Sequence, residues 1–231
     1  MNPNLVLKKV CGAACALVLA STLAAQNTRA VVCGTGLGAE LRPVEGPLQA
    51  IHAHLCGFHF YRDDPARAVR AEHYCSHLNE DVFQCVIYDS ARRDARLVGV
   101  EYIISEARFK QLPPEEKTLW HSHRYEVMSG LLAAPGASTA AELELMKELV
   151  NTYGKTWQLW QVDRGDQLPL GRPQLMMGFT ADGQLDPALV AARDRELGIN
   201  SDRLKAQRVD LPARPVAAGA DARPSGPNQD R

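Results

Sequence analysis

The chain has 231 residues, of which 45% are hydrophobic and 23% are charged, and its formal net charge at pH 7 is −1. This length and composition suit one soluble domain with a sizeable core. The near-neutral charge, together with the lack of a basic block or a stripe of basic and aromatic residues, excludes a dedicated nucleic-acid-binding protein.

The first thirty residues follow the order of a secretory signal peptide. Lys8 and Lys9 precede an apolar stretch at residues 10–25 that is rich in alanine and leucine, and small residues follow it. The stretch is shorter than the roughly 20 residues that span a bilayer. We therefore expect residues 1–30 to be a signal peptide and the mature protein to be exported, to a periplasm or outside the cell, without a transmembrane segment. An uncleaved N-terminal anchor is the alternative.

Composition divides the rest of the chain into three parts. Residues 31–47 are interrupted by glycine and proline and are predicted to form a linker. Residues 212–231 have no apolar periodicity and are predicted to be a disordered tail. Residues 48–211 remain as a single domain without internal repeats.

Four cysteines lie beyond the signal: Cys33, Cys56, Cys75 and Cys85. In an exported protein they permit three disulfide pairings, and the sequence does not choose among them. A bridge between Cys75 and Cys85 would close a short loop, and we expect at least one bridge. The alternative is that Cys56 and Cys85 are small buried apolar residues.

The first predicted element of the domain is a helix over residues 64–78. Asp64 is a suitable N-cap and Pro65 a suitable first helical residue. On such a helix His73 and His77 lie on one stripe, because residues four apart share a face.

A β-hairpin is predicted next, from β-branched and aromatic runs at residues 82–88 and 97–105. The second run is apolar on both faces except for Glu101, which is typical of a central strand. The remaining predictions are a short helix opening at residue 113, a strand at 125–132, a helix from 139 to 154, strands at 156–162 and 174–180, and a helix at 186–197. This pattern predicts an α+β fold: a single domain with a mainly antiparallel sheet and helices packed on it.

Four histidines form two close pairs that are candidate metal ligands. His73 and His77 would share a helix face, and His121 and His123 would project to the same side of an extended segment. With Glu101 the two pairs supply three or four ligands, enough for a zinc or non-haem iron site with an open position. The alternative is structural: the first pair forms a polar stripe and the second anchors a loop, both through internal hydrogen bonds.

Glu101 is the candidate catalytic residue. A carboxylate inside an apolar strand is costly to bury without a partner, so it must meet a cation, a metal ion, several donors or water. One interpretation is a functional acid or base. The other is a salt bridge to one of the many arginines.

Several long motifs resemble the oil body-associated protein family of seed plants, which has relatives in fungi and bacteria and carries a domain of unknown function. The motifs are HYCSHLNED at residues 73–81, QCVIYDS at 84–90, ARLVGVEYIISE at 95–106, LWHSHRYEV at 119–127, YGKTW at 153–157 and WQVDRGDQLPLG at 160–171. The resemblance covers essentially the whole predicted domain.

The resemblance implies a link to oil bodies and no catalytic mechanism. We therefore predict an exported oil body-associated-like protein of unknown biochemical activity, a non-enzymatic binding or accessory protein with lipid or another protein as its candidate partner. The alternative is a metal-dependent enzyme that uses zinc or iron, with His73, His77, His121 and His123 as ligands and Glu101 as acid or base.

Overall fold

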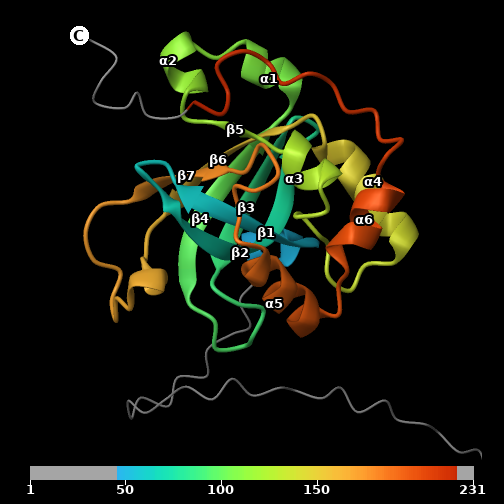
Figure 1. Cartoon of the computed structure of the whole chain (residues 1–231). Coiled ribbons are helices and arrows are strands. Elements are labelled where there is room, and N and C mark those ends of the chain that lie inside the picture. Colours follow the sequence, from blue (N-terminus) through green and yellow to red (C-terminus); the bar gives the residue numbers. More distant parts are fainter. Residues whose placement is uncertain (1–45, 223–231) are drawn as a thin grey trace, which may run out of the picture. The chain divides into compact units, whose positions relative to one another are not determined.

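A computed structural model describes residues 46–222 (Figure 1). Its centre is a closed antiparallel β-barrel of six strands. They are β1 (Ala53–Tyr61), β2 (Asp64–Asn79), β3 (Val82–Tyr88), β4 (Leu97–Ile104), β6 (Tyr153–Gln158) and β7 (Gln174–Gly178). The strand order is β4-β3-β2-β1-β7-β6, and β6 pairs back onto β4. A two-residue strand, β5 (His121–Ser122), pairs with β6 at residues that β7 leaves free.

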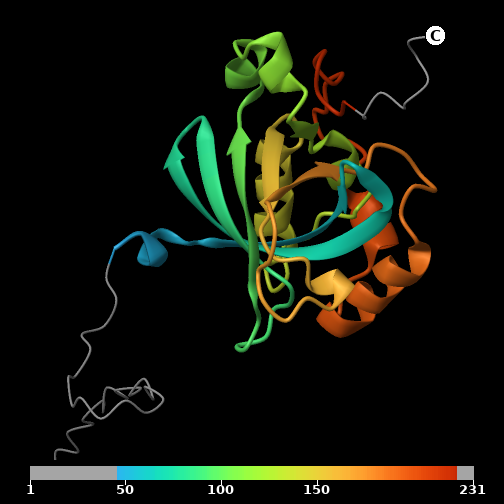
Figure 2. The same cartoon turned by 90° about the vertical axis from the view of Figure 1, so that its left-hand side faces the viewer.

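The helices are short and lie outside the barrel. They are α1 (Glu106–Lys110), α2 (Pro114–Lys117), α3 (Arg124–Met128), α4 (Thr139–Leu149), α5 (Pro187–Leu197) and α6 (Ser201–Gln207), with 3-10 turns η1 (Pro47–Ala50) and η2 (Val162–Arg164). The orange and red helices, α5 and α6, lie on one side of the barrel, while α1 and α2 lie at one end (Figure 2).

The predicted α+β fold is therefore wrong. The strands are antiparallel, but they do not form a sheet with helices packed on it: residues 99–104 of β4 pair with residues 153–158 of β6 and close the sheet into a barrel. The sequence patterns indicate strands one at a time. They do not contain the pairing of two strands about fifty residues apart.

The helix predicted over residues 64–78 is also wrong, because this segment is the long strand β2. Its backbone pairs with β1 on one side, from Ala53 opposite Cys75 to Phe60 opposite Ala68, and with β3 on the other. An N-cap stabilises a helix by about 1 kcal/mol. Two ladders of backbone hydrogen bonds and a buried inner face outweigh that local preference.

Other predicted elements agree more closely with the structure. The hairpin is confirmed as β3 and β4, and the helix at 186–197 as α5, with the Asp186 side chain accepting a hydrogen bond from the backbone N–H of Ala188. The strand predicted at 125–132 is wrong, because residues 124–128 form helix α3.

Cys75 and Cys85 face each other on β2 and β3 and form a disulfide, while Cys56 is a free, buried thiol. Cys33, the predicted signal at residues 1–30 and most of the predicted linker lie outside the described residues. Within residues 46–222 no helix is both long and apolar enough to cross a membrane.

The segment 212–222, which was expected to begin a disordered tail, runs along the barrel. We call it the C-terminal strap. Ala213 packs against the core cluster that contains Cys75 and Met146, and Ala217 and Ala220 pack against the cluster of Phe109 and Trp120. The rest of the predicted tail lies outside the described residues.

Candidate metal centre

Six buried polar side chains converge inside the barrel, each no more than 3% exposed. They are His59 on β1, His73 on β2, Glu101 on β4, His121 on β5, His123 at the start of α3 and Glu126 on α3. Strand alternation explains the inward direction of the side chains on β1, β2 and β4, because every second residue of a barrel strand faces the interior. Three overlapping groups of these residues bring one ligand atom each within 4.8 Å of one another.

The Glu101 carboxylate lies at the centre of the cluster. Its Oε2 is 2.8 Å from His73 Nε2 and 3.8 Å from His59 Nε2. Its Oε1 is 3.1 Å from His123 Nε2 and 3.6 Å from His121 Nε2. One carboxylate therefore faces four imidazole nitrogens, two at each oxygen.

The orientation of His123 is set from behind by Thr152. The Thr152 hydroxyl donates to the carbonyl oxygen of Leu149 at 2.7 Å, so it is left to accept a hydrogen bond from His123 Nδ1, 2.8 Å away. A neutral His123 then carries its proton on Nδ1 and turns the lone pair of Nε2 toward Glu101. Metal-binding histidines are typically held in this way, with one nitrogen bound to protein and the other free to bind the ion.

Several atoms of the cluster have no hydrogen-bond partner within residues 46–222. Both ring nitrogens of His73 and of His121 belong to this group, as does Glu126 Oε1. The close approach of His73 to Glu101 is therefore an ionic contact without the geometry of a hydrogen bond. Buried polar atoms are seldom left unpaired, and such a concentration of them points to a bound ion or water.

Burial and the contacts between neighbouring groups set the pKa values in the cluster. Burial lowers the pKa of His59 to about 3, against the attraction of Glu101, and lowers the pKa of His121 well below its usual value. Burial also opposes ionisation of Glu101, but contacts with His123 and His73 outweigh it and hold the pKa of Glu101 well below its usual value. Burial, and then the charge of Glu101, raise the pKa of Glu126.

Two glycines leave room for the cluster. A Cβ atom at Gly154 on β6 would lie 2.0 Å from Glu101 Oε1 and 2.7 Å from His123 Nε2. A Cβ at Gly178 on β7 would lie 2.8 Å from His121 Cδ2 and 3.0 Å from Glu126 Oε1. The barrel wall at these positions is bare backbone, which lets the polar side chains fill the interior.

A small cavity adjoins the cluster, bordered by all of its polar residues except His121 and by Leu55, Ile103, Leu132 and Leu149. Its volume is about 10 Å³. That is room for about one water molecule or one ion.

The structure brings together four of the five residues singled out from the sequence: Glu101, His73, His121 and His123. It does not bring His77 to the cluster. On an extended strand, residues four apart are separated by about 13 Å, and His77 lies at an exposed position where its Nε2 is 2.9 Å from Glu148 Oε1.

Sequence reasoning missed His59 and Glu126. On β1 every second residue, Leu55, Gly57 and His59, borders the internal cavity, so a strand assignment for 53–61 would have pointed His59 inward. Glu126 follows His123 by three residues, a spacing that shares a face once residues 124–128 are recognised as helical.

Comparison with known proteins gives a family. The family described as "Protein of unknown function (DUF1264)" matches residues 45–212. The chain is 50% identical over 162 residues to oil body-associated protein 1A of Zea mays, covering 70% of this chain and 68% of the relative. It is 45% identical over 178 residues to oil body-associated protein 1B of Arabidopsis thaliana, covering 75% and 74%. No solved structure matches.

These relatives correct the expected localisation. Export to a periplasm or outside the cell was predicted from residues 1–30, but the matched relatives, which include oil body-associated protein 2A of Zea mays at 46% identity over 175 residues, are named for association with oil bodies. The predicted location is therefore wrong. The names mention neither a metal ion nor an enzymatic activity.

Proposed function

We propose a function on the premise that the chain belongs to the oil body-associated proteins, which share the DUF1264 domain of unknown function. In this proposal it is an accessory protein whose barrel holds a divalent transition-metal ion. Glu101, His121 and His123, whose ligand atoms lie within 4.8 Å of one another, are the proposed first ligands. His73 and His59 form a second such group with Glu101, and Glu126 forms a third with His59 and His121.

The observation that carries this proposal is the convergence of four imidazole nitrogens on the buried Glu101 carboxylate, where the ring nitrogens of His73 and His121 have no hydrogen-bond partner within residues 46–222. In the tautomer of His123 that carries its proton on Nδ1, toward Thr152, the ring also presents a lone pair to a carboxylate oxygen 3.1 Å away. Two electron-rich atoms at this distance repel each other in a dry interior. A cation that binds both atoms removes the repulsion. A second proton on His123 is the competing way to do so, and metal analysis separates the two.

Charge balance supports a single divalent ion. Two carboxylates and four neutral imidazoles around one divalent cation have no net charge, which is the arrangement that a low-dielectric interior tolerates best. Without the ion, the raised pKa of Glu126 indicates that it keeps its proton beside the charged Glu101.

The donor set favours zinc or iron over magnesium or calcium. Imidazole nitrogen is a ligand for zinc and iron, whereas magnesium and calcium prefer oxygen donors throughout. The cavity of about 10 Å³ beside the cluster accepts one ion or water but no organic molecule. This closed setting favours a structural or sensing ion in an accessory protein over the turnover of a large substrate.

Metal analysis of untagged protein tests the proposal. We expect about one equivalent of zinc or iron per chain, with His121→Ala removing it and His77→Ala, a histidine outside the cluster, retaining it. A wild-type stoichiometry near zero after reconstitution with each metal would contradict the proposal and favour an imidazolium–carboxylate cluster.

Lipid contact is a second candidate function, favoured by exposed leucines. Leu168 and Leu170, on the loop before β7, are 61% and 57% exposed. The relatives are named for association with oil bodies, and apolar side chains on a loop tip can enter a lipid surface. Flotation with neutral-lipid emulsions should be lost on Leu168→Ser with Leu170→Ser, but not on Val209→Ser, an exposed residue elsewhere. Wild-type protein that fails to float at low salt would count against this function.

A further inference from the structure

Strand β5 carries His121 and ends one residue before His123, yet it contains only two residues. On one side its backbone pairs with β6, His121 opposite Gly154 and Ser122 opposite Tyr153. Two residues of strand pairing do not hold side chains firmly, so the other side of β5 must contribute to the position of the two imidazoles.

Asp221, on the C-terminal strap, occupies that other side. One carboxylate oxygen accepts from the backbone N–H of Ser122 and the second accepts from the Ser122 hydroxyl, each at 2.7 Å. The backbone N–H of Asp221 donates to the carbonyl oxygen of Trp120 at 3.0 Å. Asp221 therefore binds the residue between the two histidines and the residue before them.

The backbone of Asp221 adopts the left-handed conformation, with φ 58°, alone among the non-glycine residues described. Aspartate tolerates this conformation better than most residues, but it is uncommon and persists where surrounding contacts hold it. The short hydrogen bonds to Ser122 are contacts of this kind. The geometry of the strap is thus specialised at the residue that reaches β5.

The rest of the strap is held in place independently of β5. Asn151 bonds the strap twice, donating to the carbonyl oxygen of Pro212 and accepting from the backbone N–H of Arg214. Arg214 also pairs with Glu106 at 2.7 Å. The backbone N–H of Ala217 donates to the Tyr153 hydroxyl at 2.8 Å.

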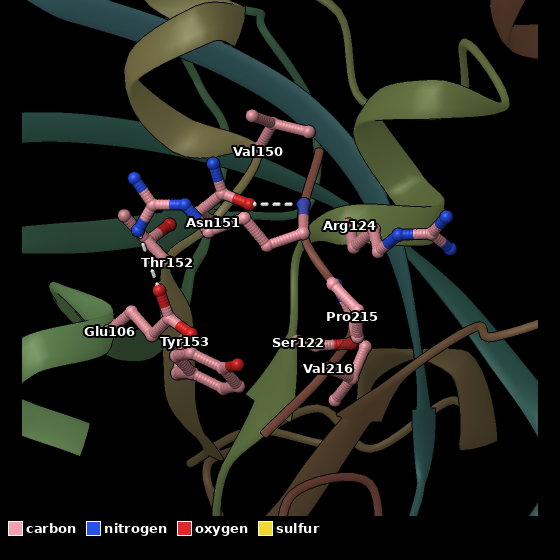
Figure 3. Close-up of a pocket in the computed structure, with 10 residues that line it drawn as sticks. Glu106, Ser122, Arg124, Val150, Asn151, Thr152, Tyr153, Pro215 and Val216 are labelled. Atoms are coloured by element: carbon pink, nitrogen blue, oxygen red, sulfur yellow. Dashed lines mark hydrogen bonds and ion pairs between the residues drawn. The ribbon is translucent and has the colours of Figure 1, made fainter. Parts of the chain in front are cut away.

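The strap also lies next to Thr152, the residue that binds the His123 ring. A small pocket beneath it is bordered by Pro215 and Val216 of the strap and by Ser122 and Thr152 of the barrel (Figure 3). Thr152 is the partner of His123 Nδ1. Ser122, which lies between His121 and His123, and Thr152, which binds His123, are therefore both next to the strap.

We infer that Asp221 is a positioning residue of the metal centre: by binding Ser122 it fixes β5 so that His121 and His123 point at the ion, and the strap thereby controls how tightly the ion is held. This inference rests on the proposed metal function. The strap beyond residue 212 lies outside the residues that the family model matches.

The experiment compares Asp221→Ala with Arg214→Ala in the full chain loaded with zinc or cobalt(II). Both variants weaken the strap, but only the first removes a contact to β5. The measurements are the rate of metal transfer to a chelator, the cobalt(II) absorption spectrum, and the thermal midpoint of the metal-free protein. Removing a supporting partner of a metal ligand typically weakens metal binding about 10- to 100-fold.

We expect Asp221→Ala to speed metal release at least about tenfold and to alter the cobalt spectrum, and Arg214→Ala to change release less than about threefold. Ser122→Ala removes only the hydroxyl contact to Asp221, so its rate of metal release should lie between those of the two other variants. It replaces Asp221→Ala in the comparison if that variant fails to fold. Equal release rates for the Asp221 and Arg214 variants would overturn the inference and leave the metal site standing. Wild-type protein that binds no metal would overturn both.

Discussion

His73 and His77 stand on the same face of strand β2, and each lies beside a glutamate, but their surroundings differ. His73 is 3% exposed, and within residues 46–222 neither of its ring nitrogens has a hydrogen-bond partner. The His77 side chain is 33% exposed, and both of its ring nitrogens are engaged: Nδ1 lies 3.0 Å from His52 Nε2, and Nε2 lies 2.9 Å from Glu148. We call His52, His77 and Glu148 the outer cluster and the six buried residues around Glu101 the inner cluster. Both ring nitrogens of His77 in the outer cluster have partners without an ion, whereas those of His73 in the inner cluster have none within residues 46–222.

The difference teaches that burial, rather than residue type, separates a candidate metal centre from a surface histidine cluster. An exposed imidazole can exchange its partners for water at little cost, whereas a buried one must find a partner inside the protein. A histidine and carboxylate pair at the surface therefore carries little information. The same pair in a closed barrel needs a physical explanation.

The sharpest test of this comparison changes the two glutamates in parallel. Glu101→Gln keeps the shape of the side chain but removes the charge that faces four imidazoles, so we expect metal affinity to fall by more than about 100-fold. Glu148→Gln, in the outer cluster, should leave it unchanged. Competition with a chromogenic chelator measures both, and equal affinities for the two variants would remove the distinction between the clusters.

A smaller loss is expected from Thr152→Val, which keeps the volume but removes the acceptor of the His123 Nδ1 proton. His123 is then free to shift its proton to Nε2, where it blocks the ion. We expect metal affinity to fall about 10- to 100-fold, with the metal-free fold retained by circular dichroism. Unchanged affinity would show that Thr152 does not set the tautomer.

The smallest expected effect concerns pH and the metal-free protein. The pKa of His59 is lowered to about 3 from an ordinary 6.5, so below pH 6.5 the unfolded chain binds a proton that the folded chain does not. Stability therefore falls as the pH falls from 6.5 toward 3. The slope is about 1.4 kcal/mol per pH unit for one such group, or about 2 kcal/mol between pH 6.5 and pH 5.

Urea unfolding at pH 7 and pH 5, with the metal removed by chelator, measures this loss. His59→Gln should reduce it, and His77→Gln, which changes an exposed side chain, should leave it as in the wild type. His121, whose pKa is also lowered by burial, should act in the same direction as His59. Glu126, whose pKa is raised by burial, acts in the opposite direction, so the contribution of His59 is the difference between the wild type and His59→Gln. An equal loss of stability in these two proteins would contradict the prediction.

Local patterns in the sequence determined part of this site. Glu101 interrupts an apolar strand, which indicates burial. His121 and His123 were correctly grouped, but the expected extended segment ends at Ser122, and His123 has the backbone angles of a helix at the start of α3. The hairpin of β3 and β4 and the helix α5 follow from β-branched runs and an N-cap with proline. These signals depend on residues close in sequence, whose relative directions the backbone fixes.

The tertiary structure decided the rest. Whether residues 64–78 were helix or strand depended on β1 and β3 as pairing partners, and that choice removed His77 from the site and kept His73 in it. Closure of the barrel through β4 and β6 brought in His59 and Glu126, and the strap added Asp221. The physical reason is that periodicity records which face of a segment is buried, whereas the partners across a closed barrel are set by long-range strand pairing that no local pattern contains.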